Sequence, residues 1–587
     1  MDPEYANLVE LFEQACAKFD ARELFGTKRG GRWEWMTFGQ FKADVDKCRG
    51  GLAQLGVRAG DKVAIISNNR VEWAVLAYAT YSLGAVYVPM YEVQPKDEWA
   101  FILHDSDAKV VVAATRVIAE TLEGLRTGCP KLEKIISLEG PGGSLSYEAL
   151  LSQGARTPKD PVYPASSEVA GFIYTSGTTG MPKGVVLSHS NICFDIWASF
   201  SCFDFGPLDR SLAFLPWAHS YGQVAELHGL LSRGTSIAIN DEVPNLVANL
   251  AEVRPTVLVA VPRIFNRIYD GIQKQMAAKP GAIRALFKKG VDVAGKKSRG
   301  ERIGTLDSMA HALADKLIFS KVRAKFGGRL RFVVSGSSAL NKDVAMFIDA
   351  LGIEVYEGYG LSETSPVAAS NYPGHRKIGS VGLPLPGVEI RIDKSVSDDN
   401  HQGEILIKGR NVMQGYHNRP EETALVLPGD GYLRTGDLGY LDEDGYLFIT
   451  GRLKEQYKLE NGKYVAPAPL EEDLKLSPFI LNAMLYGANH AYNVALIVVD
   501  KVAVAEWAKE NGVELGDLSK NQKLNELLFR EIETYGSKFK SFERPKKLFI
   551  TDEDFSTENE LLTPSLKIKR RNVLAKYGKQ LEALYSE

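Results

Sequence analysis

The chain has 587 residues, of which 45% are apolar and 24% charged, and its formal net charge at pH 7 is −3. A chain of this length exceeds what one hydrophobic core organises, so two or more domains are expected. The composition is that of a water-soluble globular protein, and the nearly balanced charge excludes a general attraction to nucleic acid.

Cysteine usage and the chain ends bear on the compartment. The five cysteines are scattered and form no C-x-x-C pair, which favours a reducing compartment without a disulfide framework. The first residues do not resemble a signal peptide, and the last four are not a peroxisomal address. We therefore expect a cytoplasmic protein.

The first two hundred residues alternate helix and strand patterns. Residues 37–40 resemble a capping box, and apolar side chains follow at helical spacing until Gly56. The nearly apolar run 74–90 is broken at Ser82 and Gly84, so it predicts a buried helix and a strand rather than a membrane span. Short strand patterns occupy residues 62–66, 110–113, 134–137 and 168–175. This alternation is typical of a doubly wound α/β sheet.

A second α/β round is expected over residues 212–356, with strands at 256–260 and 331–334. Short strands with turn signals then predict a small β-subdomain over about 378–453, in which residues 442–445 form a hairpin turn and not a calcium loop. The last part, 454–587, has the size of a separate small α+β domain. The expected fold is thus α/β, with a large domain over 1–453 and a mobile domain over 454–587.

Residues 263–331 form a basic, helix-rich stretch with 17 Lys or Arg and 5 Asp or Glu, an excess of about +12. One interpretation is a solvated helical surface. The other is electrostatic attraction to anionic lipid or to the phosphates of coenzyme A.

The most informative motif is Tyr-Thr-Ser-Gly-Thr-Thr-Gly-Met-Pro-Lys-Gly at residues 174–184. Its glycines allow a backbone to approach a polyphosphate, its hydroxyl and N–H groups can bind phosphate oxygens, and its lysine adds a positive charge. It is not a Walker loop, because Pro182 precedes Lys183 and Gly184 follows it.

This motif closely resembles the phosphate loop of the adenylate-forming superfamily, which includes acyl-CoA synthetases, peptide-synthetase adenylation domains and firefly luciferase. The strings at 215–220, 356–364, 432–439 and 562–571 resemble further core motifs of that superfamily, in its order. The long basic stretch and the string at 461–467 look most like long-chain fatty acyl-CoA synthetases. Tyr432 stands where the family usually has Trp, and Leu566 where it often has Gly.

The resemblance implies a nucleotide site. Tyr359 would stack on adenine, Asp437 would accept hydrogen bonds from both ribose hydroxyls, and Thr175 and Glu363 would bind Mg²⁺. The catalytic residues would be Lys567, Lys183, Thr175 and Glu363, with Lys569 as the alternative to Lys567. The ATP-binding residues would be Thr175, Ser176, Gly177, Thr178, Thr179, Gly180, Lys183, Gly336, Ser337, Glu357, Gly358, Tyr359, Gly360, Asp437 and Arg452.

The resemblance also implies sites for the other substrates. His219, Ser337 and Ser338 would border the acyl pocket. Gly462, Lys463 and Tyr464 would line the coenzyme A tunnel, and Lys454 would be the hinge between the domains.

The implied reaction activates a fatty acid with Mg-ATP to acyl-AMP and pyrophosphate, then transfers the acyl group to coenzyme A. Two related alternatives stay open: loading of a carrier protein, and a coenzyme A ligase for another carboxylic acid. A phosphoryl transferase and a non-catalytic nucleotide sensor are more distant alternatives. Contact with an anionic membrane and a homodimeric state are open, and no nucleic-acid partner is expected.

Overall fold

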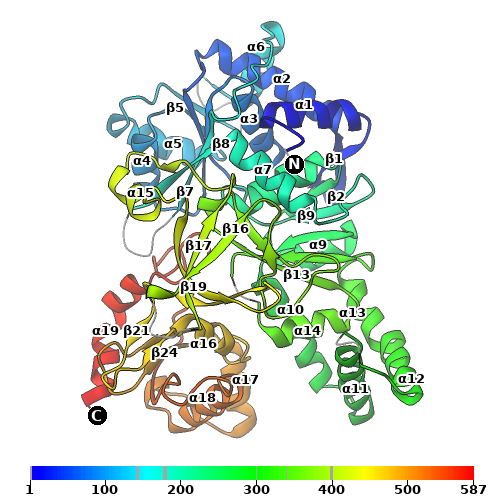
Figure 1. Cartoon of the computed structure of the whole chain (residues 1–587), viewed down its shortest axis with the longest axis vertical. Helices are drawn as coiled ribbons and strands as arrows, with labels where there is room; N and C mark the ends of the chain where they lie inside the picture. Colours follow the sequence, from blue (N-terminus) through cyan, green and yellow to red (C-terminus); the bar gives the residue numbers. More distant parts are fainter. Residues whose placement is uncertain are drawn as a thin grey trace.

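The computed structural model describes residues 3–139, 145–175, 181–298, 301–338, 340–396 and 401–586. Figure 1 shows α1 (Leu8–Phe19) and α2 (Phe38–Gln54) at one end of the molecule and α17 (Lys501–Asn511) and α18 (Gln522–Tyr535) at the other. The β-subdomain lies between these ends. The fold is α/β, as the sequence predicted.

A seven-stranded sheet organises the N-terminal region, in the order β18-β8-β7-β4-β3-β5-β6. The strands are β3 (Lys62–Ile66), β4 (Val86–Met90), β5 (Ala108–Ala113), β6 (Lys134–Ser137), β7 (Val169–Thr175), β8 (Lys183–Ser188) and β18 (Gly415–Tyr416). The strands β3 to β7 are parallel, whereas β8 runs antiparallel to β7 and β18 antiparallel to β8. Every strand predicted in this region is confirmed, and β18 joins the sheet from far along the chain.

The predicted capping box and helix–strand pair are both present. The Thr37 hydroxyl accepts a hydrogen bond from the Gln40 backbone N–H, and the Gln40 side chain accepts one from the Thr37 backbone N–H. The apolar run folds as α3 (Val71–Tyr81) and β4, with Gly84 between them at a φ of +67°. Among the residues that the structure describes, no helix is long and apolar enough to cross a membrane.

The second α/β round is divided between two sheets. The strands β9 (Arg210–Ala213) and β10 (Ser236–Ile239) extend the hairpin of β1 (Glu23–Arg29) and β2 (Arg32–Thr37) in the order β2-β1-β10-β9. A five-stranded sheet follows, ordered β11 (Val257–Ala260), β12 (Phe332–Ser335), β13 (Glu354–Gly360), β14 (Val367–Ser370) and β15 (Leu383–Pro384). The sequence predicted β11 and β12 but not the division into two sheets, because strand pairing depends on contacts between distant segments.

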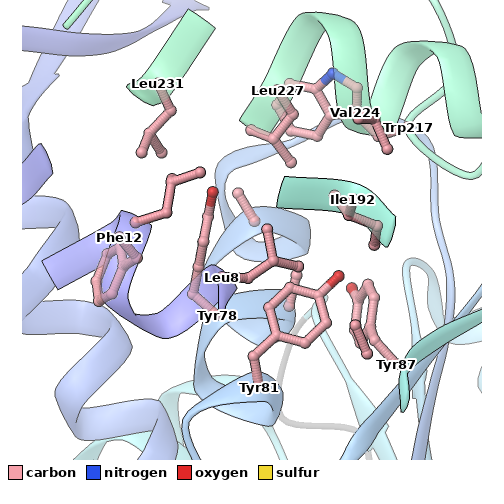
Figure 2. Close-up of a cluster of buried hydrophobic side chains, with 14 of the residues drawn as sticks. Leu8, Phe12, Tyr78, Tyr81, Tyr87, Ile192, Trp217, Val224, Leu227 and Leu231 are labelled. Carbon is pink, nitrogen blue, oxygen red and sulfur yellow. The ribbon is translucent and has the colours of Figure 1, made fainter. Parts of the chain in front are cut away.

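Helices cover these sheets. They are α4 (Lys96–Asp105), α5 (Arg116–Leu125), α6 (Tyr147–Arg156), α7 (His189–Phe200), α8 (Gly229–Ser232), α9 (Leu246–Val253), α14 (Lys342–Ala350) and α15 (Pro420–Val426). The π-helix η2 (Tyr221–His228) precedes α8. Figure 2 shows side chains from α1, α3 and η2, among them Phe12, Tyr78 and Leu227, converging on one buried cluster. Phe12 and Tyr78 stack with their ring centroids 4.7 Å apart.

The β-subdomain is a four-stranded antiparallel sheet of β16 (Glu389–Asp393), β17 (Gly403–Lys408), β19 (Leu433–Leu441) and β20 (Leu447–Arg452). Residues 442–445 form the predicted turn between β19 and β20, and Gly445 has a φ of +84°. The Lys377 ammonium lies 2.6 Å from Asp442 and 2.7 Å from Asp444, so these carboxylates form ion pairs with Lys377 at the turn.

The basic stretch folds into helices, as predicted. These are α10 (Pro262–Ala277), α11 (Gly281–Ser298), α12 (Thr305–Ala314), the π-helical turn η4 (Asp315–Phe319) and α13 (Ser320–Lys325). Figure 1 shows α11 and α12 side by side at the periphery of the molecule.

The C-terminal region has its own hydrophobic clusters. It contains the small hairpin β21 (Tyr457–Lys458) and β22 (Tyr464–Val465), the sheet β23 (Ile480–Tyr486), β24 (Val494–Val499) and β25 (Lys547–Thr551), and the helices α16 (Pro467–Leu474), α17, α18 and α19 (Arg570–Ser586). The Asn341 side chain reaches Asp473 over 2.8 Å and Lys569 reaches Glu98 over 3.5 Å. These contacts hold the C-terminal region against the N-terminal region.

Candidate active site

Lys567 lies on a short closed loop that precedes α19. The Thr563 backbone N–H donates to the Lys567 carbonyl over 2.8 Å, and the Lys567 backbone N–H donates to the Thr563 hydroxyl over 3.1 Å. Leu566 has a φ of +62°, in the left-handed region that favours glycine. The glycine that the family often has at this position would adopt such a conformation without strain. Leu566 adopts it although it carries a Cβ atom.

The charges around Lys567 come from both regions of the chain. Desolvation by neighbouring protein lowers its pKa, and Arg452 lowers it further, whereas Asp437, Glu363 and Glu455 raise it. The Lys567 side chain is nevertheless exposed to solvent, so water screens part of these effects. The structure therefore brings the predicted catalytic lysine to the predicted ribose and magnesium ligands.

Asp437 is at the centre of a small polar network. It is 5% exposed, and desolvation raises its pKa even though Arg452 and Tyr359 stabilise the ionised form. The Tyr359 hydroxyl donates to one carboxylate oxygen over 2.8 Å, and Arg452 Nε lies 3.1 Å from the other. Asp437 and Arg452 face each other across β19 and β20, so sheet register alone places the two predicted ribose ligands side by side.

Glu363 lies in the turn after β13 and is held by a residue that sequence reasoning missed. The Tyr416 hydroxyl donates to its carboxylate over 2.7 Å, and the Met413 backbone N–H donates to its carbonyl over 2.9 Å. Tyr416 is part of β18, next to the strand that begins at Lys183. No motif marks Tyr416, because its role depends on a pairing between distant segments.

The two ends of the phosphate loop face each other. Thr175 and Lys183 are partners in the β7–β8 ladder. The Lys183 ammonium pairs with Glu422 at the start of α15 and lies 5.2 Å from the centre of the Tyr416 ring. The loop residues predicted to bind ATP, Ser176, Gly177, Thr178, Thr179 and Gly180, lie outside the described residues.

The donor set suits magnesium held partly by a substrate. Among the described residues there is no group of three or more His, Cys, Asp or Glu side chains that could hold a metal ion. Mg²⁺ is commonly bound by one or two protein oxygens together with substrate phosphates. The Glu363 carboxylate accepts from Tyr416 and has further lone pairs to offer, and Thr175 ends the strand before the phosphate loop.

Glu357, Gly358, Tyr359 and Gly360, which are predicted to bind ATP, lie on β13. A Cβ atom at Gly360 would lie 1.8 Å from the Pro366 carbonyl, and one at Gly358 would lie 3.3 Å from the Ala369 carbonyl, so the strand passes close to its neighbour. Burial raises the pKa of Glu357 to about 7, although the backbone N–H groups of Leu340 and Gly379 donate to its carboxylate.

Of the predicted acyl-pocket residues, His219 contacts Tyr221 directly, and Ser337 and Ser338 follow Gly336, which lies against the Tyr221 ring. His219 Nδ1 accepts from the Tyr221 backbone N–H over 3.2 Å, and desolvation, with a contribution from Lys567, lowers its pKa to about 4. Ser337 and Ser338 are exposed, and Ser337 has a φ of +73°. A Cβ at Gly336 would come within 3.1 Å of the Tyr221 ring. His219 is therefore neutral at physiological pH.

A small apolar cavity of about 30 Å³ adjoins Tyr221. Its lining includes Phe200, Phe203, Phe205, Tyr221, Ala225 and Val259. The motifs did not reveal these residues, although the closely spaced phenylalanines are a signal in the sequence. The cavity is too small for an alkyl chain, so a chain could enter only if these side chains moved.

Of the predicted tunnel and hinge residues, Gly462, Lys463 and Lys454 lie in turns and Tyr464 begins β22. Gly462 has a φ of +82° between β21 and β22, the Lys463 ammonium lies 4.7 Å from the Phe542 ring centre, and Tyr464 is exposed. The described contacts of this hairpin lie within the C-terminal region. Lys454 is exposed in the turn after β20. Their roles stay predictions.

Lys569, the alternative candidate for the catalytic lysine, pairs with a carboxylate on α4. Lys569 lies 3.5 Å from Glu98 on α4, and the described charges that shift the pKa of Asp437 include Lys567 but not Lys569. Lys567 therefore stays the predicted catalytic lysine.

The fold and this arrangement define a class of protein. A family model described as AMP-binding enzyme matches residues 12–417, and one described as AMP-binding enzyme C-terminal domain matches residues 454–587. The chain belongs to the AMP-binding enzyme family.

Two named proteins of this family are similar to the chain over nearly its whole length. The chain is 35% identical to the "Long-chain-fatty-acid--CoA ligase FadD15" of Mycobacterium tuberculosis, with 95% of this chain and 93% of the relative covered. It is 31% identical to the human "Long-chain-fatty-acid--CoA ligase 1", with 99% and 87% covered.

Solved structures agree on the fold. An anthranilate CoA ligase in complex with anthranoyl-AMP matches with a TM-score of 0.76 and 22% identity, over 99% of both chains. The adenylation domain of a carboxylate reductase from Mycobacterium chelonae matches with a TM-score of 0.79 and 22% identity, over 100% of this chain and 92% of that one.

Proposed function

We propose that this protein is a long-chain fatty acid–CoA ligase that forms an acyl-AMP from a fatty acid and ATP and then an acyl-CoA. The observation that carries the proposal is the meeting of Lys567, from the C-terminal region, with Asp437 and Glu363 from the large region. The full-length likeness to curated long-chain fatty acid–CoA ligases gives the substrate class.

In the first half-reaction a fatty acid carboxylate oxygen attacks the α-phosphorus of ATP, and the bond to the leaving pyrophosphate breaks. The Lys567 ammonium group is positively charged and stabilises the negative charge that develops on the carboxylate and α-phosphate oxygens in the transition state. Tyr359 and Asp437 orient the nucleoside, and Lys183 binds the phosphates after leaving Glu422. Mg²⁺, bound through Glu363, Thr175 and phosphate oxygens, would neutralise phosphate charge.

In the second half-reaction the coenzyme A thiol, after losing its proton, attacks the acyl carbon and AMP leaves. The hairpin that carries Gly462, Lys463 and Tyr464 now lies within the C-terminal region, apart from the residues around Lys567. We propose that rotation of residues 454–587 about Lys454 replaces Lys567 with this hairpin, and such steps often limit turnover.

We also propose that the basic stretch at residues 263–331 contacts a membrane surface. Long-chain fatty acids partition into membranes, and a local excess of about +12 would hold the enzyme reversibly at an anionic leaflet. A homodimer is compatible with this proposal and is tested by sedimentation.

The decisive experiment measures coenzyme A-dependent release of AMP and pyrophosphate across dispersed fatty acids of increasing length. Release that requires coenzyme A and is fastest with long chains is expected. Acyl-AMP formation without acceptance by free coenzyme A would indicate a carrier-protein acceptor. Preference for another acid would overturn the long-chain assignment, and release of ADP would overturn the adenylation reaction.

A further inference from the structure

Helix α12 and the π-helical turn that follows carry a stripe of exposed apolar side chains. Leu306 is 80% exposed, Met309 69%, Leu313 49% and Leu317 48%. Their spacing of three, four and four residues places them on one side of a helix. Contiguous apolar surface of this kind marks a site of interaction, whereas single exposed apolar residues do not.

The stripe is distinct from the side of the segment that packs against the rest of the protein. The opposite side of the same segment already packs in the protein, because Ala314, Ile318 and Phe319 are buried. Gly290 allows α11 to approach closely, since a Cβ there would lie 2.6 Å from the Ala314 Cβ. The segment therefore has one apolar face that supports the fold and a second, outward one (Figure 1).

Basic side chains surround the stripe. Lys316 is exposed on the same segment, Lys321 is exposed on α13 just after it, and Arg302 is exposed just before it. The neighbouring α11 has five basic residues and one acidic residue. Lys289 lies 2.8 Å from Asp307 and Lys296 lies 3.2 Å from Asp292. The excess of about +12 over residues 263–331 already counts these two carboxylates, so the two ion pairs leave it unchanged.

We propose that Leu306, Met309, Leu313 and Leu317 insert into the surface of an anionic lipid leaflet, with the surrounding lysines and arginines binding its headgroups. An apolar stripe between basic residues is the pattern of helices that lie in a membrane interface. A second copy of this chain fits less well, because a symmetric contact through this face would bring two basic helix pairs together. The inference deepens the membrane contact of the proposed function by naming the surface that inserts.

The test compares flotation with vesicles of phosphatidylcholine, with or without phosphatidylglycerol, for the full chain and two variants. In the stripe variant Leu306, Met309, Leu313 and Leu317 are all replaced by Ser. In the control, Val117, Leu208 and Val502, which are 72%, 84% and 68% exposed and lie outside the stripe, are replaced by Ser. We expect the stripe variant to bind phosphatidylglycerol vesicles at least about tenfold more weakly, because lost apolar burial lowers partitioning. The control should bind as the unmodified protein does.

A second readout locates the stripe directly. Met309→Cys and Val502→Cys are labelled with an environment-sensitive fluorophore, which is selective because the five native cysteines are buried or half-buried. The label at 309 should shift to the blue with anionic vesicles and be quenched by acyl-chain quenchers, and the label at 502 should do neither. A stripe variant that floats normally, or a label at 309 that stays aqueous, overturns the proposal.

Two further outcomes separate the alternatives. A dimer that dissociates in the stripe variant, seen by sedimentation, would assign the stripe to a second copy and overturn membrane insertion. The ligase assay with dispersed acids and no vesicles should be unchanged in the stripe variant. Failure of that assay in the unmodified protein would overturn the proposed function while leaving the flotation result to decide the docking surface.

Discussion

The hydroxyl group of Tyr359 donates a hydrogen bond to the buried carboxylate of Asp437 over 2.8 Å. This contact joins β13 to β19 and thus connects the five-stranded sheet to the β-subdomain. Burial raises the pKa of Asp437, and Tyr359 and Arg452 oppose that effect. The proposed adenine-stacking ring and the proposed ribose ligand therefore hold each other in place before nucleotide binds.

Replacing Tyr359 with Phe tests this relationship. The ring stays available for stacking, but Asp437 loses a donor, which costs about 1.5 kcal/mol for a charged partner. We expect KM for ATP to rise roughly tenfold with little change in kcat. Tyr356→Phe is the control, because its hydroxyl contacts Glu354 on the same strand instead. An unchanged KM for ATP would show that the contact does not prepare the nucleotide site.

Lys567→Ala should separate the two half-reactions. Loss of a charged transition-state contact costs on the order of 3 kcal/mol, so acyl-AMP formation should slow by about 10²–10³. Thioester formation from supplied acyl-AMP should persist. Lys569→Ala, which removes the ion pair with Glu98, is the control and should keep both steps. An equal loss in both half-reactions of Lys567→Ala would contradict its proposed role.

Lys454→Pro probes the proposed hinge. Leu453 and Glu455 donate the described backbone hydrogen bonds in this turn, to Gly436 and Arg452, so the substitution breaks neither. Proline fixes φ near −65° and would restrict rotation. Acyl-AMP should form in single-turnover assays while acyl-CoA formation stalls, and Lys454→Ala should do both. If Lys454→Pro supports both half-reactions, the domains turn about another residue.

Leu566→Gly should relax the loop that carries Lys567. A left-handed conformation costs a non-glycine residue about 1–2 kcal/mol, and part of this returns as chain entropy lost by glycine. We expect slower hydrogen exchange at the Lys567 amide, which donates to the Thr563 hydroxyl. Leu566→Ala keeps the backbone penalty and should show no such gain. Faster exchange in the glycine variant would mean that the leucine side chain stabilises the loop.

Glu357 should make stability depend on pH. Its carboxyl group holds a proton up to about pH 7 in the folded chain, against a usual pKa of 4.5. Between these values the unfolded state binds fewer protons, so stability falls as pH rises, by on the order of 3 kcal/mol in total. Thermal unfolding from pH 4.5 to 8 should show this fall, and Glu357→Gln should reduce it. The exposed neighbour Glu354, changed to Gln, is the control; equal slopes in all three proteins would exclude Glu357 as the cause.

Local signals allowed much of this structure to be predicted. Thr37 and Gln40 form their capping box because the interaction spans three residues, and the turn at 442–445 forms from its own Asp and Gly. Asp437 and Lys567 were recognised from the sequence motifs that contain them. In the folded chain the two residues are close enough for Lys567 to lower the pKa of Asp437.

Contacts between distant segments were not predicted. Tyr416 reaches Glu363 and Glu422 reaches Lys183 only because β18 pairs with β8, and neither residue lies in a recognisable motif. The outward stripe on α12 was also missed, because the apolar residues on its two sides alternate too closely to reveal which side is buried. Packing against α11 determines which side of α12 is buried, and the sequence of α12 alone does not reveal it.

The pairing of Tyr416 with Val185 has a consequence for how the protein is made. About 230 residues separate these partners, and at about 5–20 residues per second a ribosome needs roughly ten to fifty seconds to produce them. Until then β8, the strand that begins at Lys183, is an unpaired edge of the nascent sheet, open to pairing with other chains. Tyr416, the partner of Glu363, arrives with the same late strand. Glu363 therefore gains its hydrogen-bond partner at the same stage of synthesis at which the edge that could aggregate is closed.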